Sequence, residues 1–589
     1  MESGTYRFFN GKVIIRLRDR VCDTAEKLLS SPLFGEILKR GIKDLSRRNS
    51  RLLHVFDHRE ISDGDIRLLL ETLKYLTKIP GEHVMKIVPG SEQFFRDPVL
   101  FNDFVEYFYN YWRNFQRLII VDSEGDQFDQ RPYRTFHNTI ETLTHLVRGT
   151  YRDVQENITG DHPRIYRQVR SGAEIAAIAL PKSIPYPRGP NDVYGKLASL
   201  PVIRQVLIYP PLIFSPPMNK RKGVFERVYE NPLEKVYIHR DDWLCYPAKV
   251  GELVIMIYFH IRFFELGFAL CNLFEMANDE DCNRKPDAIY LYGTDEVITS
   301  ESNGSATIFY DDEENDILVA TVPGKDDFGY FGYLKKMVLT LHNIRMMKLE
   351  RMPYHGAMFS LLIRDKGAFN VLVMGDTGAG KSETLEAMRV IGSEDIEDII
   401  IIADDMGSLK IDPDGTVLGY GTETGAFVRL DDLQPGYAFG QIDRTIIMSP
   451  AQVNARVVIP VTTFHNVIKG YPVDLVLYAN NYEEIDEDHP IIQRFSTPEE
   501  AMNVFREGTV MSKGTTTTTG LVHTYFANIF GPQQYRQLHE VLARDFFEAF
   551  FAADVFVGQF RTRLGVPGME RQGPEDAARA LLALIKNQL

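Results

Sequence analysis

Cysteine is scarce in this chain of 589 residues. The four cysteines are Cys22, Cys245, Cys271 and Cys282. Because none of them forms a Cys-x-x-Cys pair, the sequence predicts neither a zinc site nor a disulfide framework. Such low cysteine usage fits the reducing cytoplasm.

Long apolar runs are missing as well. The most apolar stretch, residues 254–274, is interrupted by His260, Arg262 and Glu265. It is more typical of a buried strand that runs into a core helix than of a membrane span. The first residues, MESGTYRFFNGK, lack the basic and then apolar regions of a secretory signal. We therefore expect a cytoplasmic protein with no membrane partner.

Positive charge is in deficit, with 66 Lys and Arg against 81 Asp and Glu, a net charge of -15 and a pI near 5.5. This balance argues against a general affinity for nucleic acid, although it allows a local basic pocket. Apolar residues at 44% and charged residues at 25% are ordinary for a globular protein. The length predicts two or three domains.

Residues 1–180 are predicted to be mostly helical. Asn10-Gly11 lies between two β-prone runs and predicts a short hairpin. Apolar residues recur at helical spacing after Asp23, and Ser62 is a suitable N-cap for a second helix. A third helix near residues 101–118 is rich in aromatic residues, which we interpret as core.

Residues 181–325 begin with a proline-rich stretch, residues 181–217, that indicates a linker or an irregular edge. The β-prone runs that follow are KVYIH, LVIMIYF, AIYLYG, ATIFYD and ILVATV. Their alternation with helical segments predicts an α/β domain, with substrate binding as its candidate role. The same alternation continues through residues 326–589, in NVLVMG, DIIIIADD, RTIIMS, ARVVIPV and DLVLYAN.

The clearest motif is a phosphate-binding loop, G-x-x-x-x-G-K-[ST]. It consists of Gly375, Asp376, Thr377, Gly378, Ala379, Gly380, Lys381 and Ser382, followed by Glu383. Residues 370–374 precede it and indicate a buried strand, and residues 383–389 indicate the first turns of a helix. A strand, a glycine-rich loop and a helix N-terminus together turn backbone N–H groups toward phosphate oxygens.

Two further residues of the loop predict nucleotide chemistry. Lys381 would neutralise the β- and γ-phosphates of ATP or another nucleoside triphosphate, and the Ser382 hydroxyl would ligate Mg²⁺. About 20 residues later, the strand-like run at residues 399–403 ends in Asp404-Asp405. Carboxylates at the C-terminal end of a parallel strand lie where ligands bind in open sheets. One could hold a metal, and the other could accept a proton from an attacking hydroxyl.

These motifs resemble a known superfamily. His355-Gly356, the loop GDTGAGKSET and the later IIIIADD are similar to HPr kinase. The wider frame resembles ATP-dependent phosphoenolpyruvate carboxykinase, since residues 332–336 are similar to its G-E-M-K-K segment and NARVVIP to N-T-R-V-S-Y-P. The resemblance covers about residues 325–589. It implies a carboxykinase-like P-loop domain beside a preceding α/β domain, with the helical residues 1–180 added.

The resemblance also implies roles for individual residues. Lys336, His355 and Asp405 would surround Mn²⁺, and lysine would have to be neutral to serve as a ligand. Tyr330 would line the substrate pocket, and Arg456 would bridge the substrate and the γ-phosphate. A threonine-rich loop, residues 514–520, would contact the nucleotide, with an aromatic-rich helix after it in HTYFANIF. The site would lie between the two α/β domains.

The sequence departs from the carboxykinase pattern in two places. The R-T-G-R-S-P-K-D segment, which binds the oxaloacetate carboxylate in that family, has only a poor echo at residues 187–192. Met406 replaces the family's glutamate after the two aspartates, and the Gly-Lys-Ser ending of the loop is closer to HPr kinase. Nucleotide and metal chemistry is therefore better supported than oxaloacetate as the substrate.

Three functions follow from these observations. The first is a carboxykinase-like phosphotransferase with Lys381, Asp405 and Arg456 as catalytic residues. The second is a kinase of a protein serine or a small-molecule hydroxyl, with Asp404 as the base. The third is a regulatory protein that senses nucleotide without turnover, with residues 1–180 binding a partner.

Overall fold

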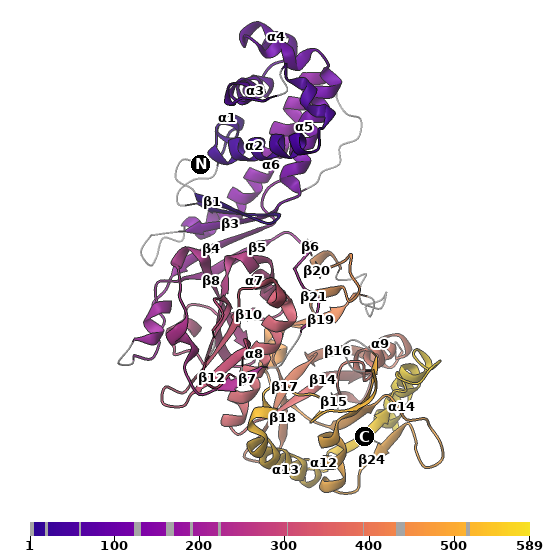
Figure 1. Cartoon of the computed structure of the whole chain (residues 1–589). Coiled ribbons are helices and arrows are strands. Elements are labelled where there is room, and N and C mark those ends of the chain that lie inside the picture. The colour runs from indigo at the N-terminus through magenta and orange to yellow at the C-terminus, as the bar shows by residue number, and fades with distance from the viewer. Residues whose placement is uncertain are drawn as a thin grey trace. The chain divides into compact units, whose positions relative to one another are not determined.

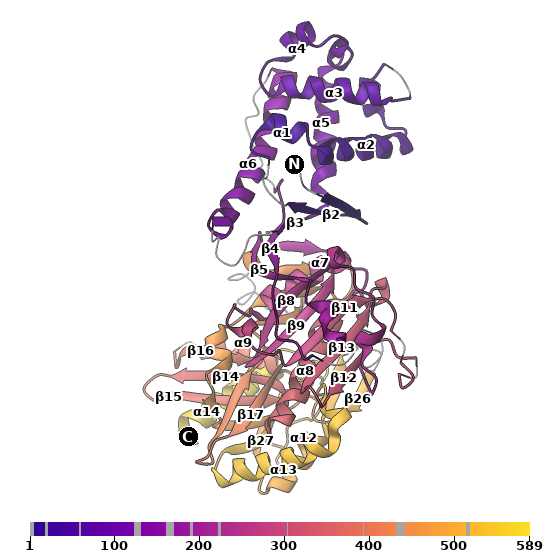
Figure 2. The ribbon, with the colours of Figure 1, turned by 90° about the vertical axis from the view of Figure 1, so that its left-hand side faces the viewer.

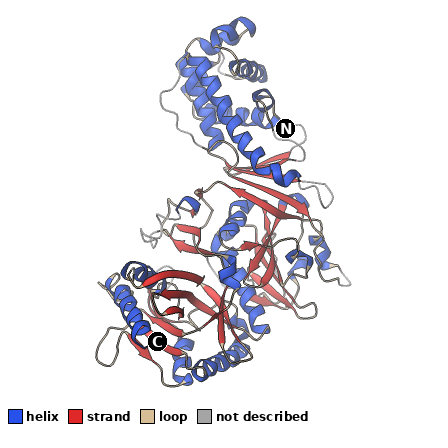
Figure 3. Ribbon diagram, turned by 180° about the vertical axis from the view of Figure 1, so that it is seen from behind, coloured by secondary structure: helices blue, strands red, loops and turns tan. Residues whose placement is uncertain are grey.

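The computed structural model describes residues 5–17, 22–57, 60–122, 131–160, 170–188, 192–221, 225–297, 299–302, 304–392, 394–430, 442–513 and 519–588. It is a mixed α/β protein with several sheets (Figure 3). Its contacts divide it into two compact units, and unit 1 comprises residues 1–181 and 202–209 while unit 2 holds the rest. Unit 2 continues across residue 325, where the sequence had predicted a domain boundary.

Unit 1 combines a small sheet with a group of helices (Figure 1). Its strands are β1 (Thr5–Phe9), β2 (Lys12–Leu17), β3 (Gln116–Asp122), β4 (Ile175–Pro181) and β5 (Pro201–Ile208). Its helices are α1 (Ala25–Leu29), α2 (Pro32–Arg47), α3 (Asp63–Leu76), α4 (Gly81–Ile87), α5 (Pro98–Arg113) and α6 (Arg131–Thr159). The sheet order is β1-β2-β3-β4-β5, and the helices lie over one side of β2 and β3 (Figure 2).

Local signals in unit 1 act as the sequence predicted. The β1–β2 hairpin pairs Phe9 with Lys12 around the Asn10-Gly11 turn, and Gly11 adopts a φ of 69° that suits glycine. Ser62 caps α3 through a reciprocal capping box with Asp65. The predicted helix at residues 101–118 ends early, at Arg113, because the chain turns into β3.

Unit 2 contains one sheet built from its first half. Its strands run in the order β8 (Trp243–Val250), β9 (Leu253–His260), β11 (Ala288–Thr294), β13 (Ile317–Pro323), β12 (Ile308–Asp312) and β7 (Glu226–Val228), with β10 (Glu275–Met276) beside β8. β9 leads into α7 (Phe264–Ala269), which confirms the predicted strand and core helix in the most apolar stretch.

One predicted strand of this region is wrong. Residues 236–239 of the KVYIH run form no strand, although their composition is β-prone. The Lys196 ammonium instead donates to the carbonyls of Leu233, Glu234 and Val236 at 2.8, 3.2 and 3.4 Å. Of the residues 236–239, only Val236 thus has its carbonyl engaged by this ammonium, and none of them pairs with a neighbouring strand among the described residues.

The second sheet of unit 2 carries the predicted motifs. Its order is β22 (Tyr471–Pro472), β18 (Val417–Gly421), β17 (Met406–Ile411), β14 (Met352–Ile363), β15 (Gly367–Met374), β23 (Leu475–Asn480), β27 (Phe556–Arg561) and β24 (Ile492–Arg494), with β16 (Ile396–Ala403) beside β14. β15, β23 and β27 are parallel, so their C-terminal ends meet at one edge.

Helices cover both faces of this second sheet. The helices are α9 (Lys381–Ile391), α12 (Pro498–Glu507), α13 (Arg536–Ala552) and α14 (Gln572–Gln588). Leu372 and Met374 of β15 pack in the core that holds α12 and α13, whereas Val371 and Val373 pack in the core that holds α9 and α14. Because β15 is buried on both faces, its sequence contains a continuous apolar run in NVLVM and no alternation with polar residues.

Smaller elements complete unit 2. They are the sheet β19 (Gly425–Arg429), β21 (Arg456–Pro460), β20 (Ile446–Met448) and β6 (Leu212–Phe214), the hairpin β25 (Thr509–Lys513) and β26 (Thr519–His523), and α11 (Phe464–Ile468). Among the described residues, none of the helices combines the length and apolar character required to cross a membrane.

Helix α8 (Phe331–Lys348) packs between the two sheets of unit 2. It contacts β8, β11 and β13 of one sheet and β14 and β17 of the other. Apolar residues lie all round it, as expected of a helix buried on every side. Its second turn carries the predicted pair Lys335-Lys336, so the helix places these lysines in the interior of the unit.

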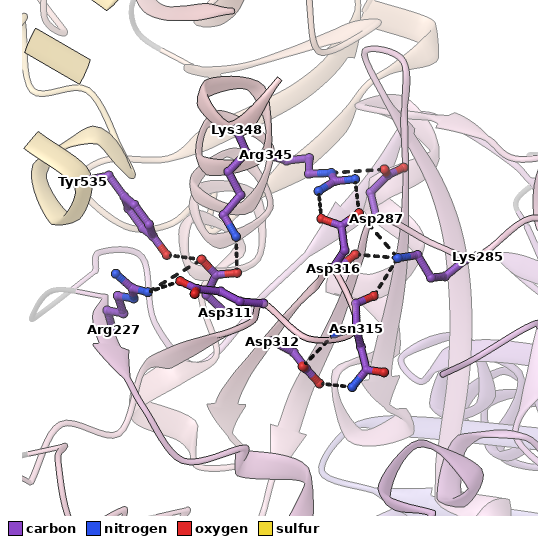
Figure 4. Close-up of polar contacts among 11 residues, drawn as sticks. Arg227, Lys285, Asp287, Asp311, Asp312, Asn315, Asp316, Arg345, Lys348 and Tyr535 are labelled. Carbon is purple, nitrogen blue, oxygen red and sulfur yellow. Dashed lines mark hydrogen bonds and ion pairs between the residues drawn. The ribbon is translucent and has the colours of Figure 1, made fainter. Parts of the chain in front are cut away.

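An acidic turn holds the C-terminal end of α8 (Figure 4). Asp311 accepts hydrogen bonds from the Lys348 ammonium and, at 2.7 Å, from the Tyr535 hydroxyl. Asp316 pairs with the Arg345 guanidinium in a bidentate contact. Each carboxylate therefore has a cationic partner on α8, and we interpret this acidic turn as a structural clasp for the helix.

The buried His342 of α8 predicts an acid-sensitive stability. Burial lowers the pKa of His342 to about 4 from an ordinary 6.5, and its Nδ1 lies 3.0 Å from Asn343 Oδ1. A depressed folded-state pKa contributes stability that is present above pH 6.5 and lost as the pH falls toward 4. As the pH falls from 6.5 to 4, the wild type should lose about 3 kcal/mol of unfolding free energy through His342. His342→Gln should not show this loss. Urea denaturation across this range measures it, and a constant difference between the two proteins would contradict it.

Candidate nucleotide and metal site

The phosphate-binding loop has the predicted strand and helix on either side. It leaves β15 at Met374 and enters α9 at Lys381, which confirms the context that the sequence indicated. Gly378 and Gly380 take φ values of 81° and 95°, which favour glycine. The N-terminus of α9 and the amides of the loop thus form an arrangement suited to a polyphosphate.

Neighbouring strand ends fasten this loop. The Thr562 hydroxyl, just after β27, donates to the Ala379 carbonyl at 2.7 Å. Asn481, just after β23, donates from its side-chain amide to the Gly378 carbonyl at 2.9 Å. The Lys381 ammonium folds back onto the carbonyls of Gly375 and Asp376, at 2.6 and 3.0 Å. These three groups bind carbonyls of the loop, whereas the Thr377 amide donates to Asp376 Oδ1 and the Ala379 amide to the Asp376 carbonyl.

The Asp405 side chain contacts two other parts of unit 2. Its Oδ1 lies 3.0 Å from His355 Nε2, and its Oδ2 lies 2.8 Å from Lys335 Nζ. Burial alone would raise the pKa of Asp405, but Lys335 and the hydrogen bond from His355 outweigh it and hold this pKa well below the usual range. Asp405 is thus an anion in this site. Its charge also interacts with that of Lys381 in the phosphate-binding loop.

The strand before Asp405 differs from the prediction in one respect. β16 pairs antiparallel with β14, so the aspartates do not end a strand of a parallel pair. β14 is antiparallel to β15 as well, and β15 and β16 therefore run in the same direction. Their C-terminal ends reach the same edge, which brings the aspartates to the loop by a different route.

Asp404 has a different environment from its neighbour. Burial raises the pKa of Asp404 to about 6, and the charge of Asp405 adds to this rise while Lys335 and Lys381 oppose it. Two adjacent carboxylates with separated pKa values are a pattern suited to distinct roles. A carboxylate that titrates near neutral pH is able to accept a proton at physiological pH.

His355 is positioned from both of its ring nitrogens. It lies on β14, is 1% exposed, and its backbone carbonyl accepts a hydrogen bond from the Gly375 amide at 3.2 Å. Its Nδ1 contacts the Ala527 carbonyl, which leaves Nε2 directed at Asp405. A ring held in this way presents one defined nitrogen to the site.

The turn that supplies the Ala527 carbonyl corrects a prediction. HTYFANIF was expected to form a helix, but Phe526, Ala527 and Asn528 take φ values of 43°, 56° and 60°. Three successive left-handed residues make a turn, and the next helix, α13, begins only at Arg536. Such strain is concentrated at functional sites, and here it aims a carbonyl at His355. Residues 514–518 of the threonine-rich segment lie outside the described residues.

The two lysines of α8 have opposite electrostatic environments. Burial works against the charge of Lys335, but Asp405 and Glu423 outweigh it and raise its pKa. Burial lowers the pKa of Lys336 to about 8, and Arg221 adds to this effect. The Lys336 ammonium lies 4.5 Å from the centre of the Phe530 ring. Neither lysine is the solvated surface residue that an isolated Lys-Lys pair would suggest.

Glu423 completes this charge cluster from the loop between β18 and β19. It is 1% exposed, and its Oε1 lies 3.0 Å from Lys335 Nζ. Burial raises the pKa of Glu423 to about 8, and Asp405 adds to this rise while Lys335 opposes it. Glu423 thus shares one buried lysine with Asp405.

An aromatic and arginine group lies beside the lysines. Tyr330 immediately precedes α8, and its ring centre lies 5.9 Å from that of Phe427. The Arg456 guanidinium lies 5.5 Å from the same Phe427 ring. Burial raises the pKa of Tyr330, whereas Arg456, Lys335 and Arg221 lower it. The structure thus brings Tyr330 and Arg456 together as the sequence had grouped them.

Donor atoms of the kinds that Mn²⁺ accepts lie in this group. The structure contains a carboxylate and an imidazole whose facing atoms are 3.0 Å apart, and burial favours the neutral form of the nearby Lys336 amine. Oxygen and imidazole donors suit Mn²⁺. A cluster of at least three His, Cys, Asp or Glu residues is not found among the residues that the structure describes. The Ser382 side chain is exposed at the start of α9, where a nucleotide-bound Mg²⁺ would reach it.

The site also contains residues that sequence reasoning missed. They are Arg221, Lys335 as a charge partner, Glu423, Asn481, Phe530 and Thr562. A lone arginine in MNKRKG and a lone glutamate in GTETG match no motif, and only the fold brings them here. Residues 189–191 of the weak arginine echo lie outside the described residues.

A search among known protein families and a search among curated proteins found no match to this chain.

Proposed function

We propose that this protein transfers the γ-phosphoryl group of a nucleoside triphosphate in a reaction that depends on a divalent metal, in the manner of phosphoenolpyruvate carboxykinase. The observation that carries the proposal is the position of Asp405. It contacts Lys335 and His355, and its charge also couples it to Lys336 and to Lys381 of the phosphate-binding loop. Lys335 and Asp405, which are 70 positions apart in the sequence, thus meet beside one loop.

Phosphoryl transfer needs in-line placement and charge neutralisation more than covalent chemistry. The loop amides and Lys381 would bind the triphosphate, with Ser382 holding Mg²⁺. Lys336, His355 and Asp405 would hold Mn²⁺, and the metals would supply charge neutralisation when bound. Arg456, whose planar fork lies beside Tyr330, would stabilise the transferring group and orient the acceptor.

A second candidate function has its own observation. The pKa of Asp404, about 6, makes this carboxylate a suitable base for a hydroxyl acceptor. An enolate acceptor would need no such base. The HPr kinase-like reaction, on a protein serine or a small-molecule hydroxyl, therefore remains the alternative.

The acceptor is tested with purified protein, Mg²⁺, Mn²⁺, ATP and oxaloacetate, with phosphoenolpyruvate measured directly. Formation of phosphoenolpyruvate would support the carboxykinase-like reaction. ATP binding without phosphoenolpyruvate would contradict it and direct the search to hydroxyl acceptors. Absence of nucleotide binding with any metal would contradict both candidates.

The loop itself is tested by Gly380→Ala. An added Cβ would lie 2.6 Å from Thr562 Oγ1 and would occupy a residue with a φ of 95°. Because the loop must shift away from Thr562, ATP affinity should fall at least about tenfold in titration calorimetry.

Gly367→Ala is the matched control for this change. Gly367 has a φ of 99°, but no atom lies within 4 Å of its added Cβ. It should lose about 1 kcal/mol of stability and keep its ATP affinity. Equal losses of affinity in both variants would contradict the role of the loop.

A further inference from the structure

One face of α8 packs against the turn at residues 526–530. Lys336, Thr340 and Asn343 follow one another at spacings of four and three residues, so they lie on the same face of the helix. The Asn343 side chain is buried, and its Nδ2 donates to the Phe530 carbonyl at 2.8 Å. The Lys336 ammonium lies over the ring of the same Phe530. This face of α8 therefore contacts both the backbone and the ring of one residue of the turn.

The close approach of the turn to α8 requires a glycine. Gly531 follows Phe530 with a φ of 93°, and an added Cβ would lie 2.9 Å from the Thr340 carbonyl oxygen and 3.1 Å from Ile344 Cγ1. A side chain at this position would be strained and would push the turn away from the helix. Gly531 thus permits the packing in which the Asn343 hydrogen bond forms.

The Asn343 amide is oriented by its other contacts. Its Oδ1 lies 3.0 Å from His342 Nδ1, and its Nδ2 lies 3.1 Å from the sulfur of Met406, the residue after Asp405. A flipped amide would place Oδ1 against the Phe530 carbonyl, and two acceptors repel each other. Asn343 therefore joins α8, the turn and the strand that begins directly after Asp405.

The turn depends on such outside support. Its residues 526–528 are all left-handed, a strained backbone that persists only where the surroundings hold it. The hydrogen bonds that its backbone amides donate to neighbouring carbonyls are 3.2–3.4 Å long, whereas the bond from Asn343 is 2.8 Å long. The same turn supplies the Ala527 carbonyl that binds His355 Nδ1. A group that holds the turn therefore also sets the direction of the His355 imidazole.

We infer that Asn343 is a positioning residue of the proposed metal site, where it holds the turn that orients both His355 and Lys336. The inference rests on the proposed function, because these two side chains are proposed ligands of Mn²⁺. Asn343 acts on His355 through the Ala527 carbonyl and on Lys336 through the Phe530 ring. Residues that orient metal ligands from outside contribute about ten- to a hundredfold to metal affinity.

The test replaces Asn343 by leucine in the full chain. Asn343→Leu has a similar size but neither donates nor accepts a hydrogen bond, so Mn²⁺ affinity in electron paramagnetic resonance should fall about ten- to a hundredfold. A second readout needs no metal. The His355 Nδ1 proton, bound to the Ala527 carbonyl, should give a low-field signal in ¹H NMR that His355→Gln lacks. In Asn343→Leu this signal should shift or disappear.

Two further variants serve as a control and as a second route to the turn. Asn157→Leu removes another 2.8 Å bond from an asparagine amide to a backbone carbonyl, that of Leu76 in unit 1, and should change neither readout. Gly531→Ala keeps the Asn343 amide but displaces the turn, so it should also weaken Mn²⁺ binding. Gly367→Ala, whose added Cβ meets no atom, should bind Mn²⁺ as the wild type does.

The inference is overturned if Asn343→Leu, folded as judged by circular dichroism, keeps the Mn²⁺ affinity or the His355 signal of the wild type. It is also overturned if Asn157→Leu changes either readout to the same extent. If Asn343→Leu does not fold, a wild-type Mn²⁺ affinity in Gly531→Ala overturns it. A wild type that binds no Mn²⁺ would instead contradict the proposed function, and the His355 signal alone would then decide whether Asn343 positions the imidazole.

Discussion

Asp405→Asn is expected to lower the rate of phosphoryl transfer at least about a thousandfold. The substitution keeps the size of the side chain but removes the anion that faces His355 and Lys335. It also removes an oxygen ligand of the proposed Mn²⁺. The affinity of the protein for Mn²⁺ should therefore fall by about ten- to a hundredfold. Glu423 still pairs with Lys335, so the variant should fold. Phosphoenolpyruvate formation measures the first effect, and Mn²⁺ titration by electron paramagnetic resonance measures the second without any turnover.

The matched control for this substitution is Asp398→Asn. Asp398 lies on the same strand, β16, but it is exposed at the end away from the loop. This control should keep both the rate and the Mn²⁺ affinity of the wild type. If Asp405→Asn binds Mn²⁺ as tightly as the control does, Asp405 is not a ligand and the proposed metal site is wrong.

The phosphate-binding loop and the two aspartates could be predicted because each motif consists of consecutive residues. A strand, a glycine-rich loop and a helix occupy residues 367–391 without interruption, so the whole motif lies in one stretch of the sequence. Asp404-Asp405 could be predicted for the same reason, since the carboxylates directly follow an apolar strand. In both cases the periodicity of the sequence and the chemistry of the motif agree.

The other residues of the site are brought there by tertiary packing, and no sequence motif marks them. Glu423 reaches Lys335 only because α8 packs against β17, while β17 and β18 form a pair. The HTYFANIF segment shows a different failure, since the family resemblance implied a helix where the fold has a left-handed turn. The Glu423–Lys335 and Ala527–His355 contacts both join residues far apart in the sequence, which local propensity does not encode.

The charge cluster of Lys335 has a consequence for stability that does not depend on any ligand. Lys335→Met is expected to lower the free energy of unfolding by about 3–5 kcal/mol, because it leaves the Asp405 anion and the buried Glu423 carboxyl group without their cationic partner. Lys335 is 2% exposed and lies within 3.0 Å of oxygens of both Asp405 and Glu423. Chemical denaturation without nucleotide or metal measures the loss.

Two further variants distinguish the stability lost with the ion pairs from the stability lost with the buried aliphatic part of Lys335. Lys410→Met breaks an exposed pair with Asp412, 2.7 Å long with side chains 40% and 31% exposed, and should cost no more than about 1 kcal/mol. The double variant Lys335→Met with Glu423→Gln removes one of the two stranded carboxylates, so it should be more stable than Lys335→Met alone. A Lys335→Met loss no larger than that of Lys410→Met would contradict the cluster's role. A double variant less stable than the single one would show that burial of the stem, and not charge pairing, is what Lys335 contributes.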